Sequence, residues 1–123
     1  MSVHVLTATR VDGWNLEQLT ALPRGPAQPV DVLFVHGICT GARIFAERFL
    51  DAFAAAGFRA HALSLRGHGG SDGRDWLKTF TLADYVADLR AALAAIGRPT
   101  VVVGFSMGGA VLQAHLRAGG RPA

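Results

Sequence analysis

Three short apolar segments that alternate with helical patterns constrain the fold of this chain more than any other feature. The apolar segments cover residues 30–36, 58–65 and 100–105, and the helical patterns cover residues 44–56, 82–96 and 107–117. Strands that alternate with helices of this length form a mostly parallel sheet with helices on both faces. At 123 residues the chain has room for one domain. The sequence therefore predicts a single three-layer αβα domain over residues 1–123.

Local signals set the boundaries of these elements. Asp12 and Gly13 separate two extended stretches, which predicts a β-hairpin over residues 3–22. The three prolines within residues 23–29 predict a surface loop. One helix should carry Phe45, Phe49 and Phe53 on one face and end at Gly57, and the next should begin with a capping box at Thr81 and Asp84.

The third apolar segment runs directly into a serine flanked by glycines. Val101, Val102 and Val103 are expected to form a buried strand, and Gly104-Phe105-Ser106-Met107-Gly108 follows as G-x-S-x-G. A serine between a strand and a helix is typical of a nucleophile elbow, a tight turn with a strained backbone. Gly104 and Gly108 would let the neighbouring backbone pass close to that turn, because they carry no Cβ.

A second motif follows the first of the three apolar segments. His36 and Gly37 stand at its carboxyl end, where parallel sheets place their sites. The backbone N–H of Ile38 could then face the N–H of Met107 and form an oxyanion hole. One such donor contributes roughly 2.7–4 kcal/mol of transition-state stabilisation.

With these motifs the chain resembles the α/β-hydrolase superfamily over essentially its whole length. The resemblance includes Asp12-Gly13, residues 32–37, the glycine-rich string from Leu65 to Arg74, Asp84-Tyr85 and residues 104–109. The glycine-rich string is most similar to the lysophospholipase and monoacylglycerol-lipase branch. The resemblance implies a Ser106 nucleophile, oxyanion donors at Ile38 and Met107, a small ester or lipid substrate, and no metal or cofactor. A serine at this place disfavours the branches that use an aspartate nucleophile.

The triad of this family is incomplete in the chain. Its order is serine, then an acid, then histidine, but no Asp or Glu follows Ser106. His115, the only later histidine, lies nine residues along the same helix, about 13 Å by helical rise. His36 is expected to shape the oxyanion loop, and His68 is the one earlier histidine that could replace the missing base.

Composition excludes several other classes. The net charge of +3 comes from scattered arginines and one lysine, without the basic patch that nucleic-acid binding needs. A single cysteine, Cys39, excludes an internal disulfide and a cysteine-based metal site. No apolar run reaches the roughly 20 residues of a membrane span, and the first residues lack a signal-peptide pattern. A cytoplasmic protein is expected.

Three hypotheses stay open. The chain is the N-terminal half of a serine esterase, or it is a catalytically inactive fragment or interaction module, or a second polypeptide supplies the missing strands and residues. In each case the strand at 100–105 lacks its outer neighbour, and an apolar edge strand favours self-association.

Overall fold

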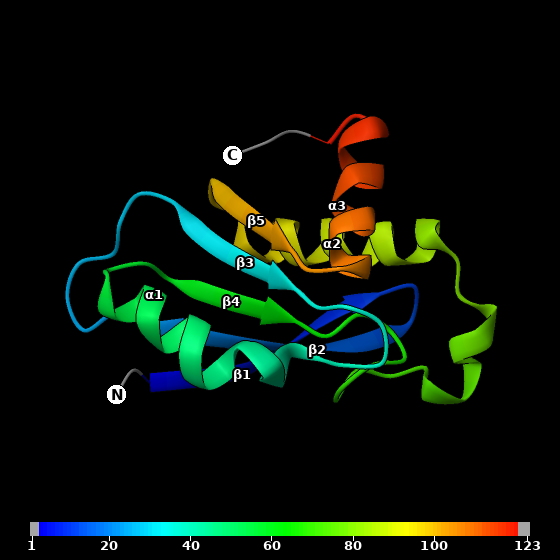
Figure 1. The fold of residues 1–123 in the computed structure, drawn as a ribbon, viewed down its shortest axis with the longest axis horizontal. Helices are drawn as coiled ribbons and strands as arrows, with labels where there is room; N and C mark the ends of the chain where they lie inside the picture. Colours follow the sequence, from blue (N-terminus) through cyan, green and yellow to red (C-terminus); the bar gives the residue numbers. More distant parts are fainter. Residues whose placement is uncertain (1–2, 121–123) are drawn as a thin grey trace.

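A five-stranded sheet in the order β1-β2-β4-β3-β5 runs through the protein (Figure 1). The computed structural model describes residues 3–120. The strands are β1 (Val3–Val11), β2 (Trp14–Leu22), β3 (Asp31–Val35), β4 (Ala60–Leu63) and β5 (Thr100–Gly104). The helical elements are η1 (Ala42–Phe45), η2 (Ala46–Leu50), α1 (Asp51–Ala55), η3 (Arg74–Thr79), α2 (Leu82–Ile96) and α3 (Met107–Arg117).

The predicted hairpin forms between β1 and β2. Its antiparallel register runs from Val3 opposite Leu22 to Val11 opposite Trp14. Asp12 and Gly13 both have positive φ, 49° and 83°. Two such residues make a type I′ turn, whose twist matches that of the flanking strands, so the Asp-Gly signal is confirmed.

The rest of the sheet is mixed. β3 pairs in parallel with β4 on one side and with β5 on the other, whereas β4 pairs antiparallel with β2. Phe105 N–H donates to the carbonyl of Val35 (2.9 Å), which extends the β3–β5 ladder by one bond beyond the strand. The residue after Phe105 is Ser106, so this ladder carries the chain directly to the predicted turn.

Helices cover both faces of the sheet. On one face α2 and α3 bury a cluster that includes Leu33, Leu63, Leu89 and Val111. On the opposite face the helical elements between β3 and β4 bury a second cluster around Phe34. Figure 1 shows α1 in front of the sheet and α2 behind it. This is the αβα layering that the alternation of strands and helices predicts.

The phenylalanine stripe packs as its spacing predicts. Phe45, Phe49 and Phe53 all contact the ring of Phe34, with centroids 5.1, 5.7 and 5.3 Å away. The helix predicted at residues 44–56 is instead three consecutive segments, 3₁₀, π and α, over residues 42–55. Gly57, with φ 96°, ends it in the left-handed conformation expected of a C-terminal glycine.

Helix α2 begins and ends as predicted. The Thr81 side chain accepts a hydrogen bond from Asp84 N–H, and the Asp84 carboxylate accepts one from Thr81 N–H. Gly97 closes the helix with φ 66°. The predicted strand at 58–65 is shorter, because Leu65 N–H donates to the ring of His36 (2.9 Å) instead of to a strand.

Strand β5 is less buried than its three valines suggest. Val101 is 45% exposed and Val103 is 39% exposed, while Val102 packs against the core under α2 and α3. Within residues 3–120 β5 pairs with β3 alone, so its outer edge is open. The expectation of a buried strand is therefore wrong for two of the valines, and the expectation of an apolar edge is confirmed.

Candidate active site

Ser106 sits on a strained turn between β5 and α3. Its φ of 56° and ψ of −116° lie outside the regions that a residue with a Cβ normally occupies. The residue is exposed and immediately precedes the first turn of α3. Such strain costs on the order of 1–3 kcal/mol and typically occurs at functional sites. The backbone thus has the form that a nucleophile elbow requires.

Gly104 and Gly108 allow this turn to form. A Cβ on Gly104 would lie 2.5 Å from the carbonyl oxygen of Gly108. A Cβ on Gly108 would collide with the carbonyl oxygen of Val35, at the end of β3. The first turn of α3 therefore packs directly on the backbone of two strands, and only glycine fits at either position.

The loop after β3 lies against the serine. A Cβ on Gly37 would be 3.2 Å from the Cβ of Ser106. The carbonyl oxygen of Gly37 accepts hydrogen bonds from His36 Nδ1 (2.6 Å) and from the Thr40 hydroxyl (2.9 Å). Because the peptide is planar and trans, these bonds also fix the direction of the Ile38 N–H.

Two backbone donors near the serine have no acceptor among residues 3–120. They are the N–H groups of Ile38 and Met107, whereas Gly108 and Gly109 N–H already donate to the carbonyls of Phe105 and Ser106. A free N–H in the first turn of a helix favours negative charge nearby. The oxyanion role of Ile38 and Met107 stays a prediction that this geometry permits.

His36 has a structural role. Its ring is fully buried, donates from Nδ1 to Gly37 and accepts at Nε2 from Leu65 N–H. The pKa of His36 is lowered to about 4, mainly by burial of the ring. The hydrogen bond to Gly37 raises the pKa, and the neighbouring His68 lowers it. Both ring nitrogens are occupied, so His36 cannot take a proton from Ser106. It holds the loop after β3 instead.

No imidazole among residues 3–120 forms a hydrogen bond with the Ser106 hydroxyl. His68 donates from Nδ1 to the Arg66 carbonyl (3.0 Å), and its ring is buried against His36 and Tyr85. Its Nε2 is buried and has no partner in this part of the chain. His115 lies on α3 and accepts from Arg90 (3.3 Å); burial, and then Arg90, lower its pKa.

A buried ion pair anchors the glycine-rich loop, and the sequence analysis missed it. Arg66 is 3% exposed and Asp88 is fully buried; Arg66 Nε donates to the Asp88 carboxylate (2.9 Å), and so does Arg66 backbone N–H (2.9 Å). Burial alone would lower the pKa of Arg66, but the hydrogen bonds to Asp88 and Asp12 raise it. An aspartate on the apolar face of α2 is the signal that could have revealed the pair, since buried charges need partners.

A second buried network ties that loop to the one after β3. Ser64 accepts a hydrogen bond from Ala42 N–H (2.9 Å) and donates to Glu17 (2.8 Å), which also accepts from Gly70 N–H (3.0 Å). A Cβ on Gly41 would lie 2.9 Å from the Cα of Gly69. These contacts hold the glycine-rich loop against the loop after β3, and Gly37 of the latter loop lies beside Ser106.

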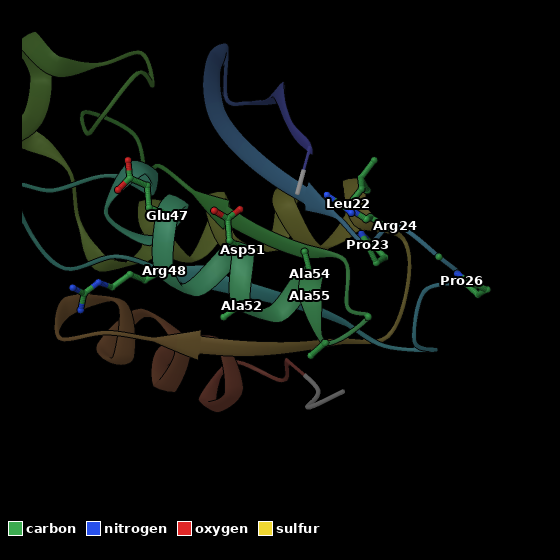
Figure 2. Close-up of a pocket in the computed structure, with 13 residues that line it drawn as sticks. Leu22, Pro23, Arg24, Pro26, Glu47, Arg48, Asp51, Ala52, Ala54 and Ala55 are labelled. Carbon is green, nitrogen blue, oxygen red and sulfur yellow. The ribbon is translucent and has the colours of Figure 1, made fainter. Parts of the chain in front are cut away.

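A cavity of about 840 Å³ lies away from this turn, between the loop at 23–26 and the helical segments η2 and α1 (Figure 2). Glu47 and Asp51 project from the same side of these segments in Figure 2. Asp51 accepts a hydrogen bond from His4 (2.6 Å). Neither Ser106 nor its two backbone donors line this cavity. The strained backbone therefore identifies the candidate site better than cavity size does.

An exposed serine on a strained strand-to-helix turn, at the carboxyl end of parallel strands, defines the α/β-hydrolase class of sites. A model of the alpha/beta hydrolase fold family matches residues 31–116. That range covers more than half of the chain, and the chain belongs to this family. A search of curated protein sequences finds no match.

Solved structures with this fold are similar to the chain. The thioesterase domain from the curacin biosynthetic pathway is 25% identical with a TM-score of 0.80, over 94% of this chain and 40% of that one. Epoxide hydrolase A from Mycobacterium thermoresistibile is 24% identical with a TM-score of 0.75, and the match covers 92% of this chain and 34% of that one. An epoxide hydrolase from Vigna radiata is 24% identical with a TM-score of 0.76, and the match covers 91% of this chain and 35% of that one. The chain thus spans little more than a third of these structures.

Two further features are absent from residues 3–120. No helix there is long and apolar enough to cross a membrane. No group of three His, Cys, Asp or Glu side chains in the same range could hold a metal ion. Cys39 is exposed, with φ 62°, in the loop after β3.

Proposed function

We propose that the chain carries the nucleophile and oxyanion hole of a serine hydrolase that acts on carboxylic esters. The observation that carries this proposal is the strained, exposed Ser106 beside the N–H groups of Ile38 and Met107, which have no acceptor among residues 3–120. A histidine from outside the described residues takes the proton of the Ser106 hydroxyl, and the serine oxygen attacks the ester carbonyl, whose electron pair moves onto the carbonyl oxygen. Ile38 and Met107 N–H then donate to that oxyanion. The histidine later returns that proton to the leaving alcohol. Collapse of the intermediate expels the alcohol and leaves an acyl-serine, which water hydrolyses.

The base and the acid come from outside the described residues under this proposal. No histidine among residues 3–120 forms a hydrogen bond with Ser106, and the chain spans 34–40% of the solved structures named above. The open edge of β5, with Val101 and Val103 exposed, offers a place for a further strand to pair. A polypeptide that extends the sheet there would bring the acid and the histidine to the serine. In their absence a second copy of the chain would pair at the same edge.

The substrate proposal rests on the glycine-rich string from Leu65 to Arg74, which favours acylglycerols or lysophospholipids. A thioester is the second candidate, favoured by the likeness to the thioesterase domain. Both reactions use the same acyl-serine and differ only in the leaving group, an alcohol or a thiol.

The experiment compares hydrolysis of a p-nitrophenyl ester and of a thioester with the same acyl chain. The polypeptide that contains this chain together with the acid and histidine should hydrolyse at least one, and Ser106→Ala should abolish turnover. The 123-residue chain alone should be nearly inert, because removal of a triad base costs on the order of 10⁶ in turnover. Full activity in Ser106→Ala would contradict the proposal. A complete, folded but inert protein would support the alternative, a catalytically inactive member that serves as an interaction module.

A further inference from the structure

The four residues that follow His36 form a turn beside Ser106. The turn runs from Gly37 to Thr40, with Ile38 and Cys39 at its centre. Cys39 has φ 62°, the left-handed conformation that the third residue of a type II turn adopts and that favours glycine. A Cβ on Gly37 would lie 3.2 Å from the Cβ of Ser106, so the turn starts directly against the proposed nucleophile. The turn therefore carries backbone strain next to the candidate active site.

One peptide of this turn is held by two side chains. The Gly37 carbonyl oxygen accepts hydrogen bonds from His36 Nδ1 (2.6 Å) and from the Thr40 hydroxyl (2.9 Å). The C=O and the N–H of a trans peptide point in opposite directions. Two donors on the Gly37 carbonyl therefore keep the N–H of Ile38 turned away from them. This N–H has no acceptor among residues 3–120, and Ile38 is exposed.

The two donors differ in what else they hold. The His36 ring is fully buried and also accepts from Leu65 N–H (2.9 Å), so it is part of the core at this end of the sheet. Thr40 is exposed, and its hydroxyl makes no other hydrogen bond among residues 3–120. The bond from Thr40 to Gly37 thus acts on the turn alone. A substitution at Thr40 changes the turn without disturbing the core.

The strain in the turn and the hydrogen bond from Thr40 are of similar size. A left-handed residue with a Cβ and a single neutral hydrogen bond each change a conformational equilibrium by a factor on the order of ten. Beyond the turn, Ala42 N–H donates to the buried Ser64 hydroxyl (2.9 Å) and anchors the chain there. Without the Thr40 bond, Cys39 is free to relax toward negative φ, and the peptide between Gly37 and Ile38 loses one of its two anchors.

We propose that Thr40 is a positioning residue for the reaction at Ser106. Its hydroxyl holds the Gly37 carbonyl, and the Ile38 N–H thereby stays directed at the carbonyl oxygen of the substrate as this oxygen becomes negative. Thr40 itself does not touch the substrate. The role rests on the proposed hydrolase function, and it gives the turn at residues 37–40 a part in binding the transition state but none in binding the ground state.

The test compares Thr40→Val with Thr40→Ser in the polypeptide that joins this chain to an acid and a histidine. Valine keeps the shape of threonine but has no hydroxyl, so kcat on a p-nitrophenyl ester should fall about two- to tenfold while KM stays unchanged. Serine keeps the hydroxyl and should keep kcat. A trifluoromethyl ketone adds to the serine oxygen and places an oxyanion where the intermediate has one. Its Ki should therefore rise in Thr40→Val by the factor by which kcat falls. A rise of KM with kcat unchanged would contradict the positioning role.

Thr79→Val is the matched control. The Thr79 hydroxyl also donates to the carbonyl oxygen of the residue three positions earlier, Trp76 (2.7 Å), and Thr79 is exposed like Thr40. This bond lies in η3, outside the turn at residues 37–40. Thr79→Val should leave kcat and Ki unchanged. An equal loss in Thr79→Val and Thr40→Val would show that the effect is a general loss of stability.

A second readout does not depend on activity. The ¹⁵N NMR order parameter of the Ile38 N–H should fall in Thr40→Val and stay at the wild-type value in Thr40→Ser and Thr79→Val. An active wild type, with neither kcat nor this order parameter changed in Thr40→Val, would overturn the role of Thr40 and leave the hydrolase function standing. An inert, folded wild type would contradict the hydrolase function, and the role of Thr40 with it, even if the order parameter falls.

Discussion

At the carboxyl end of the parallel strands, Ser106 has a strained backbone and a hydroxyl with no hydrogen-bond partner among residues 3–120. At the amino end, Thr20 sits in an ordinary strand, and its hydroxyl donates to an imidazole that is paired with a carboxylate. The second arrangement has the hydroxyl, imidazole and carboxylate of a catalytic triad, but it is buried and already satisfied. The first has the exposure and strain of a nucleophile but lacks the base.

This difference shows that a list of residue types does not define an active site. A hydroxyl–imidazole–carboxylate chain inside a sheet stabilises the fold, whereas a strained residue reduces stability and is kept where chemistry needs it. The polar cluster at the amino end and the strained Ser106 should therefore respond to substitution with opposite signs. Substitutions at the amino end should lower the free energy of unfolding, and relaxation of Ser106 should raise it.

The largest effect is expected at the amino end, from Asp31→Ala. It leaves Arg98 and the buried His61 without their shared acceptor. Breaking a buried charged pair costs about 3–5 kcal/mol of unfolding free energy. Urea unfolding measures this loss of unfolding free energy. Asp75→Ala is the control, because Asp75 is exposed and has no ion pair among residues 3–120. A loss as small as that of the control would mean that the carboxylate does not hold this end together.

Gly108→Ala should have the next largest effect, at the carboxyl end. The added Cβ would collide with the Val35 carbonyl oxygen, which belongs to the backbone and cannot move aside. We expect a loss of about 3 kcal/mol, as for overpacked cores. Gly109→Ala is the matched control: its Cβ would meet the Gly104 carbonyl oxygen at 3.4 Å, an ordinary contact. If both variants are equally stable, α3 does not pack on β3 in this way.

The free energy of unfolding should decrease as the pH is lowered, because of the buried His36 near the carboxyl end of the sheet. The pKa of His36 is about 4 in the folded protein, mainly because the ring is buried, and 6.5 in the unfolded chain. Above pH 6.5 the ring is neutral in both states. Between those values only the unfolded state binds the proton, so the free energy of unfolding decreases by about 3 kcal/mol as the pH falls.

The measurement is urea unfolding at pH 7 and at pH 4.5 for the wild type and for His36→Gln. The variant cannot titrate at this position, and its loss between the two pH values should be clearly smaller. His115, whose pKa burial also lowers, is present in both proteins and cancels in the comparison. Equal losses in the two proteins would show that His36 is not the group responsible.

The smallest effect should have the opposite sign. Ser106→Gly removes the Cβ that makes φ 56° and ψ −116° unfavourable, and it should raise the free energy of unfolding by about 1 kcal/mol. Ser106→Ala keeps a Cβ and should give no such gain, which makes it the matched control. Differential scanning calorimetry can compare the two. A less stable Ser106→Gly would indicate that the turn is not strained in solution.

Much of the fold could be predicted from sequence because its signals are local. Asp12 and Gly13, Thr81 with Asp84, and the glycines around Ser106 act on residues within a few positions of themselves. The exposure of Val101 and Val103 could not be predicted from the valines, since it depends on which strand lies beside β5. Arg66 with Asp88, and Asp31 with His61, are 22 and 30 positions apart, and only the assembled sheet shows that they meet.

The central claim is that the Ser106 hydroxyl is exposed on a strained turn and ready to attack an acyl group. The most direct measurement is mass spectrometry after treatment with a fluorophosphonate probe. The protein is the polypeptide that joins this chain to an acid and a histidine. We predict one covalent adduct, located at Ser106 by peptide mapping and absent in Ser106→Ala. A folded protein that stays unlabelled, or that is labelled at another serine such as Ser64 or Ser71, would contradict the account.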